Sequence, residues 1–182
     1  MLVAKQVADV LTALRVVIGF AFVWLAVSQG DLALPFAAWL MIASWTTDFL
    51  DGPVARRSSL QYHTWLGNHD LEVDMTISVG VLIYMMYAGF MSFVVGLLYI
   101  LLWGVVFWRL GIVRSLGMLV QAPIYGLFIW VVYQHSPSNA YWMITWIAAA
   151  LLLTWPRFPR EVIPGFLEGM NGVLDRLRSE DR

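Results

Sequence analysis

The stretch Thr47–Asp74 reads TDFLDGPVARRSSLQYHTWLGNHDLEVD and lies between two long apolar segments. Asp48 and Asp51 are three residues apart at the end of the first segment, and Asp70 and Asp74 are four residues apart at the start of the second. Side chains three or four residues apart share one face of a helix. If the two segments are neighbouring helices, the two carboxylate pairs can face each other.

The composition places the chain in the membrane class. Of its 182 residues 60% are apolar and 13% are charged, and the mean hydropathy is +0.74. A soluble domain has about 25% charged residues. The chain has no cysteine, which excludes disulfides and thiolate metal sites.

Uncharged stretches predict six transmembrane helices. Two of the stretches are long enough for a helical hairpin, with breaks at Ala88-Gly89 and at His135–Asn139. The first two are shorter than the roughly 20 residues that a crossing needs. Their helices should therefore continue past Arg15 and Asp48, which places these residues in a polar pocket near the membrane boundary. The four uncharged stretches are 16–30, 32–47, 75–108 and 115–156.

The positions of Lys and Arg predict the orientation. All eleven fall before the first predicted span, between spans two and three, between spans four and five, or after the last. Because short cytoplasmic loops are enriched in Lys and Arg, both termini and the loop 51–70 should be cytoplasmic. A signal peptide cleaved after Ala26-Val27-Ser28 is the alternative, but it would leave five spans and termini on opposite sides.

We therefore expect one all-α membrane domain over residues 1–182. Residues 1–15 are amphipathic and predict an interfacial helix, 16–156 predict the six-helix bundle, and 157–182 predict an amphipathic cytoplasmic tail.

The acidic pairs point to divalent metal chemistry. Four carboxylates at a membrane boundary repel one another, and cations would neutralise them. Oxygen ligands suit Mg²⁺ or Mn²⁺, and two such ions can clamp the attacking and leaving oxygens of a displacement at phosphorus. Small residues at Gly52, Ala55 and Gly67 would let a diphosphate approach the backbone, and Arg56 could pair with a phosphate oxygen.

This stretch resembles the signature of the CDP-alcohol phosphatidyltransferases, D-x2-D-G-x2-A-R-x8-G-x3-D-x3-D. The first half matches in residue and spacing from Asp48 to Arg56, and Asp70 and Asp74 match each other. The linker departs from the signature, because ten residues instead of eight separate Arg56 from Gly67, and two instead of three separate Gly67 from Asp70.

The resemblance implies an enzyme of a bacterial-type plasma membrane that transfers a phosphatidyl group from CDP-diacylglycerol to a small alcohol, releases CMP, and forms a homodimer. Nucleic acid is not an expected partner. Mg²⁺ or Mn²⁺, with two ions expected, would be the cofactor, and Asp74 would also act as general base. The implied metal ligands are Asp48, Asp51, Asp70 and Asp74, and the implied CDP-lipid contacts are Thr47, Gly52, Ala55, Arg56 and Gly67.

The acceptor is suggested by basic residues outside the signature. The segment Leu11-Thr12-Ala13-Leu14-Arg15 looks like the L-T-x-x-R segment of phosphatidylglycerophosphate synthases, although Asp9 and Leu110 depart from the pattern of those enzymes. Arg15, Arg109 and Arg114 could bind a phosphorylated acceptor such as glycerol 3-phosphate. For Arg109 and Arg114, a role in topology alone is an equal alternative.

Two other classes of protein use carboxylates in membranes. A membrane prenyltransferase binds diphosphate through two acidic motifs, but these lie far apart in the chain. An ion carrier tends to place its carboxylates near the midplane of the bilayer. Here both acidic pairs fall within 27 residues, and an ion carrier gives no reason for Gly52, Ala55 and Arg56 beside them.

Overall fold

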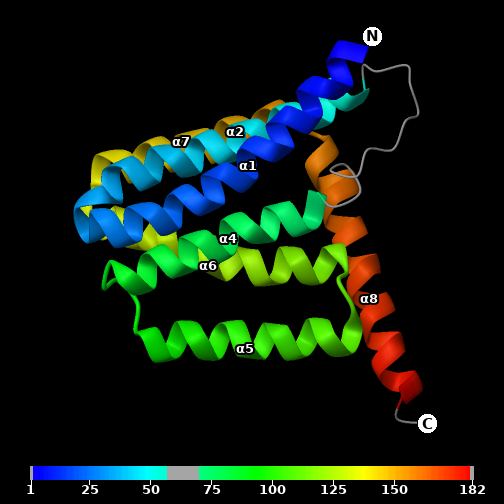
Figure 1. Ribbon diagram of the computed structural model, residues 1–182. Coiled ribbons are helices and arrows are strands. Elements are labelled where there is room, and N and C mark those ends of the chain that lie inside the picture. Colours follow the sequence, from blue (N-terminus) through cyan, green and yellow to red (C-terminus); the bar gives the residue numbers. More distant parts are fainter. Residues whose placement is uncertain (1, 57–69, 181–182) are drawn as a thin grey trace.

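The structure is a computed structural model that describes residues 2–56 and 70–180, and it describes side chains for residues 10–50 and 71–178. Within these ranges it is helical and has no strand (Figure 1). The elements are α1 (Leu2–Ser28), η1 (Gly30–Ala33), α2 (Leu34–Arg56), α4 (Asp70–Tyr87), α5 (Phe93–Leu110), α6 (Arg114–His135), α7 (Pro137–Leu153), η2 (Phe158–Val162) and α8 (Ile163–Glu180).

Both predicted hairpin breaks are confirmed. The helix α4 ends before Gly89, which has a φ of 79°, a conformation that glycine adopts at little cost. The helix α6 ends at His135, and α7 begins at Pro137, where the missing amide hydrogen of proline costs nothing.

The expectation that the first two helices pass their bounding charges is also confirmed. Arg15 lies inside the continuous helix α1, and Asp48 lies inside α2. Because α1 runs unbroken from Leu2, the structure has no separate helix over residues 2–15. Three of the described helices are long and apolar enough to cross a membrane, namely at Val10–Ser28, Phe93–Leu110 and Arg114–His135. The count of six spans remains a prediction.

The hydrophobic core lies between α1, α2, α4, α6 and α7. Phe22 and Phe128 meet edge to face with ring centroids 6.2 Å apart, and Tyr84 packs against both rings. The helix α5 lies at the edge of this bundle, and Gly96 is its one buried residue (Figure 1).

The helices α1 and α4 approach each other through glycines. A Cβ atom added to Gly80 would lie 2.5 Å from the carbonyl oxygen of Gly19, and one added to Gly19 would lie 3.1 Å from the carbonyl oxygen of Thr76. Small residues allow helix backbones in a membrane to pack this closely. This contact brings the polar ends of α1 and α4 together.

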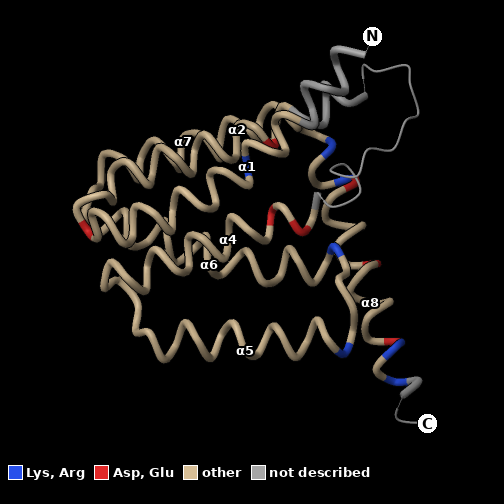
Figure 2. The backbone as a smooth tube through the Cα atoms, in the orientation of Figure 1, with Lys and Arg blue, Asp and Glu red and all other residues tan. Residues whose placement is uncertain are grey.

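Charged residues gather at one end of the bundle, where α5 ends, α6 begins and α8 crosses (Figure 2). The turns at the opposite end, at residues 29–33, 88–92 and 136, contain Asp31 and no Lys or Arg. This distribution is the one that the predicted orientation requires.

Candidate functional site

Three helices contribute a buried ionic cluster. The Nη1 atom of Arg15 on α1 donates to Asp48 Oδ1 on α2 at 2.8 Å and to Asp74 Oδ1 on α4 at 2.5 Å. Because both carboxylate oxygens contact the same nitrogen atom, they lie close to each other. The structure therefore brings one aspartate of each sequence pair to a common point.

The local structure holds the arginine in this position. Thr12 lies one helical turn before Arg15, and its Oγ1 atom accepts a hydrogen bond from Nη2 at 3.3 Å. The contact of Gly19 with Gly80 lies one turn beyond Arg15 on α1 and sets the separation of α1 from α4. The guanidinium is thus oriented from its own helix toward the two carboxylates on neighbouring helices.

The two carboxylates differ in exposure. The Arg15 side chain is fully buried, whereas 27% of the Asp74 side chain and 55% of the Asp48 side chain are exposed. A ligand can therefore reach Asp48 directly, and Asp74 lies deeper. Asp74 could take a proton from a hydroxyl group that enters from the side of Asp48.

The other two predicted metal ligands lie in the same helices. Asp51 is one turn after Asp48 on α2, and Asp70 is the first residue of α4, but their side chains lie outside the described set. Glu72 on α4 is exposed. Among the side chains that the structure describes, no group of three or more His, Asp or Glu residues is placed to hold a metal ion.

The residues predicted to contact the CDP-lipid follow Asp48 along α2 or precede α4. Thr47 is nearly buried, and its hydroxyl donates to the Ser44 carbonyl at 2.7 Å within its own helix. For Gly52, Ala55 and Arg56 the structure describes the helical backbone alone, and Gly67 lies outside the described residues.

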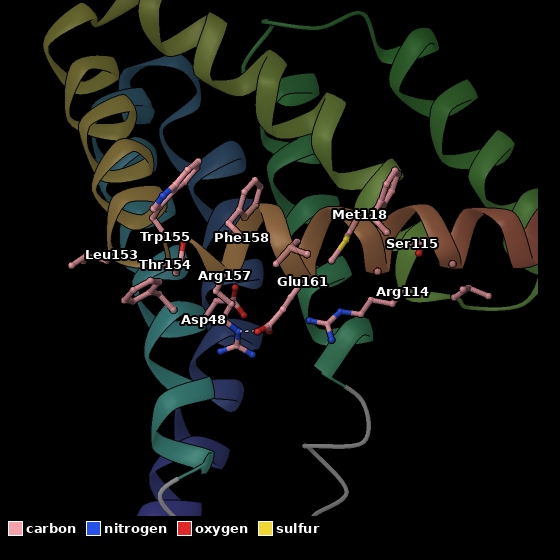
Figure 3. A pocket seen from close by; sticks show the side chains of 16 residues that line it. Asp48, Arg114, Ser115, Met118, Leu153, Thr154, Trp155, Arg157, Phe158 and Glu161 are labelled. Atoms are coloured by element: carbon pink, nitrogen blue, oxygen red, sulfur yellow. Dashed lines mark hydrogen bonds and ion pairs between the residues drawn. The ribbon is translucent and has the colours of Figure 1, made fainter.

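A cavity of about 880 Å³ opens beside Asp48 (Figure 3). Its walls come from the end of α2, the start of α6, the end of α7, and the segment from η2 into α8. Apolar side chains such as Phe49, Met118 and Phe166 form most of the lining, and its charged residues are Asp48, Arg114, Arg157 and Glu161. A cavity with apolar walls and a few convergent charges is a typical binding site for an amphiphilic ligand.

The structure places the three arginines that were predicted to bind the acceptor in different surroundings. Arg114 begins α6 and lines the cavity, whereas Arg109 is exposed near the end of α5 and is not among the lining residues. Arg15 is also absent from the lining. Arg157, which the sequence placed in the tail without a function, lines the cavity and pairs with Glu161 at 2.6 Å. Only its position just after the last predicted span could have suggested this location.

The chemistry of the described donors fits a hard divalent cation. The oxygens of Asp48 and Asp74 converge on one point, and carboxylate oxygens are the preferred ligands of Mg²⁺ and Mn²⁺. The positive group at that point in the structure is the Arg15 guanidinium, which partly offsets the charge of the two carboxylates.

Comparison with known protein families identifies the family of the chain. A family model described as CDP-alcohol phosphatidyltransferase matches residues 5–165, which include most of α1, the acidic stretch and the helices from α2 to α7. No curated protein and no solved structure matches the chain.

Proposed function

The chain belongs to the CDP-alcohol phosphatidyltransferase family, and we propose that it transfers the phosphatidyl group of CDP-diacylglycerol to a small alcohol with release of CMP. The family and the apolar helices make the chain an integral membrane transferase of phosphate-containing groups from CDP-alcohols. The choice of CDP-diacylglycerol and the nature of the acceptor are the parts that we add.

The main support is the meeting of Asp48, which lines the cavity, with Asp74 on the neighbouring helix. These residues are the first and last aspartates of the family signature, and they come from helices that the chain joins through residues 57–69. Both aspartates contact the guanidinium of Arg15, so their oxygens converge on one positive group. A reaction at a charged diphosphate needs such a point, because negative charge must be offset where it develops.

In the proposed reaction, Asp74 takes the proton of the acceptor hydroxyl. The resulting oxygen attacks the phosphorus attached to diacylglycerol, a new phosphorus–oxygen bond forms, and the bond to the CMP oxygen breaks, so that CMP carries away the negative charge. Asp48, Asp51, Asp70 and Asp74 would hold the divalent cations, which when bound neutralise the diphosphate. Proton removal by a positioned base contributes about 10²–10⁴-fold to such a rate.

We propose that the acceptor bears a phosphate group. The cavity beside Asp48 contains the cations Arg114 and Arg157, and arginine binds phosphate through two parallel hydrogen bonds. Arg157 would then exchange its contact with Glu161 for the acceptor. A phosphorylated alcohol such as glycerol 3-phosphate satisfies this requirement, whereas inositol, serine and choline do not bring a phosphate group.

We also propose that the active site and both termini face the cytoplasm of a bacterial-type cell and that the protein acts as a homodimer. The gathering of arginines at the end of the bundle that contains the cavity supports the orientation.

The test is CMP release from CDP-diacylglycerol by the purified protein, with Mg²⁺ or with a chelator, against a panel of acceptors. The panel contains glycerol 3-phosphate, inositol phosphate, inositol, serine, choline and phosphatidylglycerol, and each lipid product is identified. We expect Mg²⁺-dependent CMP release that is fastest with a phosphorylated acceptor, and loss of release in Asp48→Asn. Absence of CMP release with every acceptor would contradict the proposal and would favour an ion carrier or a prenyltransferase, neither of which releases CMP.

A further inference from the structure

Arg15 is a fully buried arginine in a helix that can cross the membrane. An ionisable side chain at such a position is costly unless it has partners, and it usually marks a functional site. Two of its partners among the described side chains are Asp48 and Asp74, which both accept from the same guanidinium nitrogen. The positive charge of Arg15 thus lies beside negative charges that belong to two other helices.

The cluster would be unstable without this charge. Asp48 and Asp74 would then face each other across a short gap, and their like charges would repel each other. Solvent screens this repulsion only in part, because Asp74 is mostly shielded from water although Asp48 is more than half exposed. A neutral side chain in place of Arg15 therefore leaves the carboxylates in need of another cation.

The position of Arg15 is built into the packing of the helices. Its second nitrogen donates to Thr12, and the close contact of Gly19 with Gly80 limits movement of α1 against α4. The guanidinium is a rigid planar group that contacts several oxygens at fixed positions. The geometry therefore favours a permanent component of the site over a side chain that samples many rotamers.

We propose that Arg15 is a resident counter-ion that holds Asp48 and Asp74 together before a divalent cation binds, and that it competes with the cation for the same oxygens. This inference rests on the proposed function, because it takes these aspartates to bind the cation. Arg15 is then a positioning residue that keeps the site assembled without metal and lowers the affinity for metal.

Two other roles for Arg15 fit the structure less well. A residue that only sets topology would have its charge in water or among headgroups, whereas Arg15 is fully buried. A residue that binds the acceptor would direct its charge at the acceptor's phosphate, whereas the guanidinium of Arg15 already contacts Asp48, Asp74 and Thr12.

The experiment measures cation affinity directly, without substrate. Purified wild type, Arg15→Met and Arg15→Lys are stripped of divalent ions, and Mn²⁺ binding is followed by the loss of the free-ion EPR signal. We expect Arg15→Met to bind Mn²⁺ at least about tenfold more tightly than wild type, since a neighbouring unit charge changes the proton affinity of a carboxylate by about 10- to 1,000-fold and acts on a metal cation in the same direction. Arg15→Lys keeps the charge and should bind Mn²⁺ nearly as wild type does.

Thermal unfolding in detergent gives the second measurement. In chelator, Arg15→Met should unfold at a lower temperature than wild type, and Mg²⁺ should raise its midpoint by more than it raises that of wild type, because tighter binding to the folded state stabilises it more. If Arg15→Met proves too unstable to purify, Arg15→Met combined with Asp48→Asn removes the facing charges and should be recovered. Loss of both variants would show that Arg15 is needed for a reason other than charge and would overturn the proposal.

The outcomes separate this inference from the proposed function. Wild type that binds no Mn²⁺ and releases no CMP would remove the proposed function, and the inference with it. If wild type binds Mn²⁺ and Arg15→Met binds it with equal or lower affinity, the inference about Arg15 is overturned and the proposed function is not.

Discussion

At the scale of single residues, the site depends on two aspartates in different surroundings. Asp48 is more than half exposed and faces the cavity, whereas Asp74 lies deeper, with 27% of its side chain exposed. The more accessible carboxylate suits a metal ligand that meets the incoming substrate. The less accessible one suits a base that accepts the proton of a bound hydroxyl group away from bulk water.

Replacing Asp74 by asparagine should abolish transfer but leave part of the cation binding. The amide oxygen can still contact a cation, but the amide cannot accept the proton of the acceptor hydroxyl. We expect turnover to fall by at least about 10²-fold, the usual contribution of a general base. Glu72→Gln, an exposed position on the same helix, is the matched control and should keep wild-type turnover. CMP release and Mn²⁺ binding are measured for both, and wild-type turnover in Asp74→Asn would remove Asp74 from the mechanism.

Arg114→Ala should weaken the use of a phosphorylated acceptor. Arg114 lines the cavity, and loss of a charge-assisted contact to phosphate costs about 1.5–3 kcal/mol, or a rise in KM of roughly 10- to 150-fold. Arg109→Ala removes a similar charge from a position outside the cavity and should leave the KM unchanged. Steady-state kinetics with varied glycerol 3-phosphate compares the two, and equal effects would assign both arginines to topology.

At the scale of the elements, the crossing of α1 and α4 determines whether the cluster forms. The backbones meet at Gly19 and Gly80, and Arg15 and Asp74 lie toward the charged end of the same two helices. Any side chain at Gly80 must push α1 away, because the nearest atom is a backbone oxygen that cannot rotate aside.

Gly80→Val should therefore lower both stability and cation affinity. Overpacking of this kind costs about 1–3 kcal/mol of folding free energy. Gly104→Val on α5 is the control, since a Cβ atom at Gly104 meets nothing within 4 Å. Thermal unfolding and Mn²⁺ titration of both variants measure the effect. The same unfolding midpoint for Gly80→Val and wild type would show that the two helices can separate at no cost.

The docking of α8 on α6 forms one wall of the cavity. A Cβ atom at Gly169 would collide with Ser115 at the start of α6, and Val173 is buried one turn further along α8. Arg176 also donates to the Leu110 carbonyl at 3.4 Å, which ties α8 to the end of α5.

Gly169→Leu should displace α8 and reduce transfer more than it reduces stability, because α8 has an amphipathic face and lies at the edge of the bundle. Gly172→Leu is the control, since a Cβ atom there meets nothing within 4 Å. We expect a fall in kcat/KM in Gly169→Leu alone, with similar unfolding midpoints for the two variants. Unchanged kcat/KM in Gly169→Leu would show that α8 is not needed to form the cavity.

At the scale of the whole molecule, charge separates the two ends of the bundle. The end with the cavity contains the arginines of α6, η2 and α8, and the opposite turns contain none (Figure 2). This asymmetry predicts that the cavity faces the cytoplasm and that the turns at Ser92 and Ser136 face outward.

The absence of cysteine allows a direct test of this topology. Single cysteines are introduced by Ser92→Cys, Ser136→Cys and Asn171→Cys, and intact cells are treated with a membrane-impermeant maleimide. The first two should be labelled in intact cells, and the third only after the membrane is opened. Labelling of Ser92→Cys and Ser136→Cys on opposite sides would contradict the six-span arrangement.

The sequence alone determined the class of the protein and the two breaks that divide its long apolar stretches into helical hairpins. Apolar stretches, the breaks at Gly89 and Ser136, and the spacing of the aspartates depend on local chemistry, so they could be read without coordinates. The family signature belongs to the same level, since it is a contiguous pattern of 27 residues. The prediction that the helices pass Arg15 and Asp48 followed from the thickness of a bilayer alone.

Only the tertiary structure decided which side chains meet. Arg15 is 33 residues from Asp48 and 59 from Asp74 in the sequence, and their contact depends on how α1 packs against α2 and α4. For the same reason, the sequence grouped Arg15 with Arg109 and Arg114, although the structure places one with the aspartates, one outside the cavity and one in its wall. Contacts between distant segments depend on packing at the crossing of helices, here the glycines Gly19 and Gly80, and a linear pattern does not contain that information.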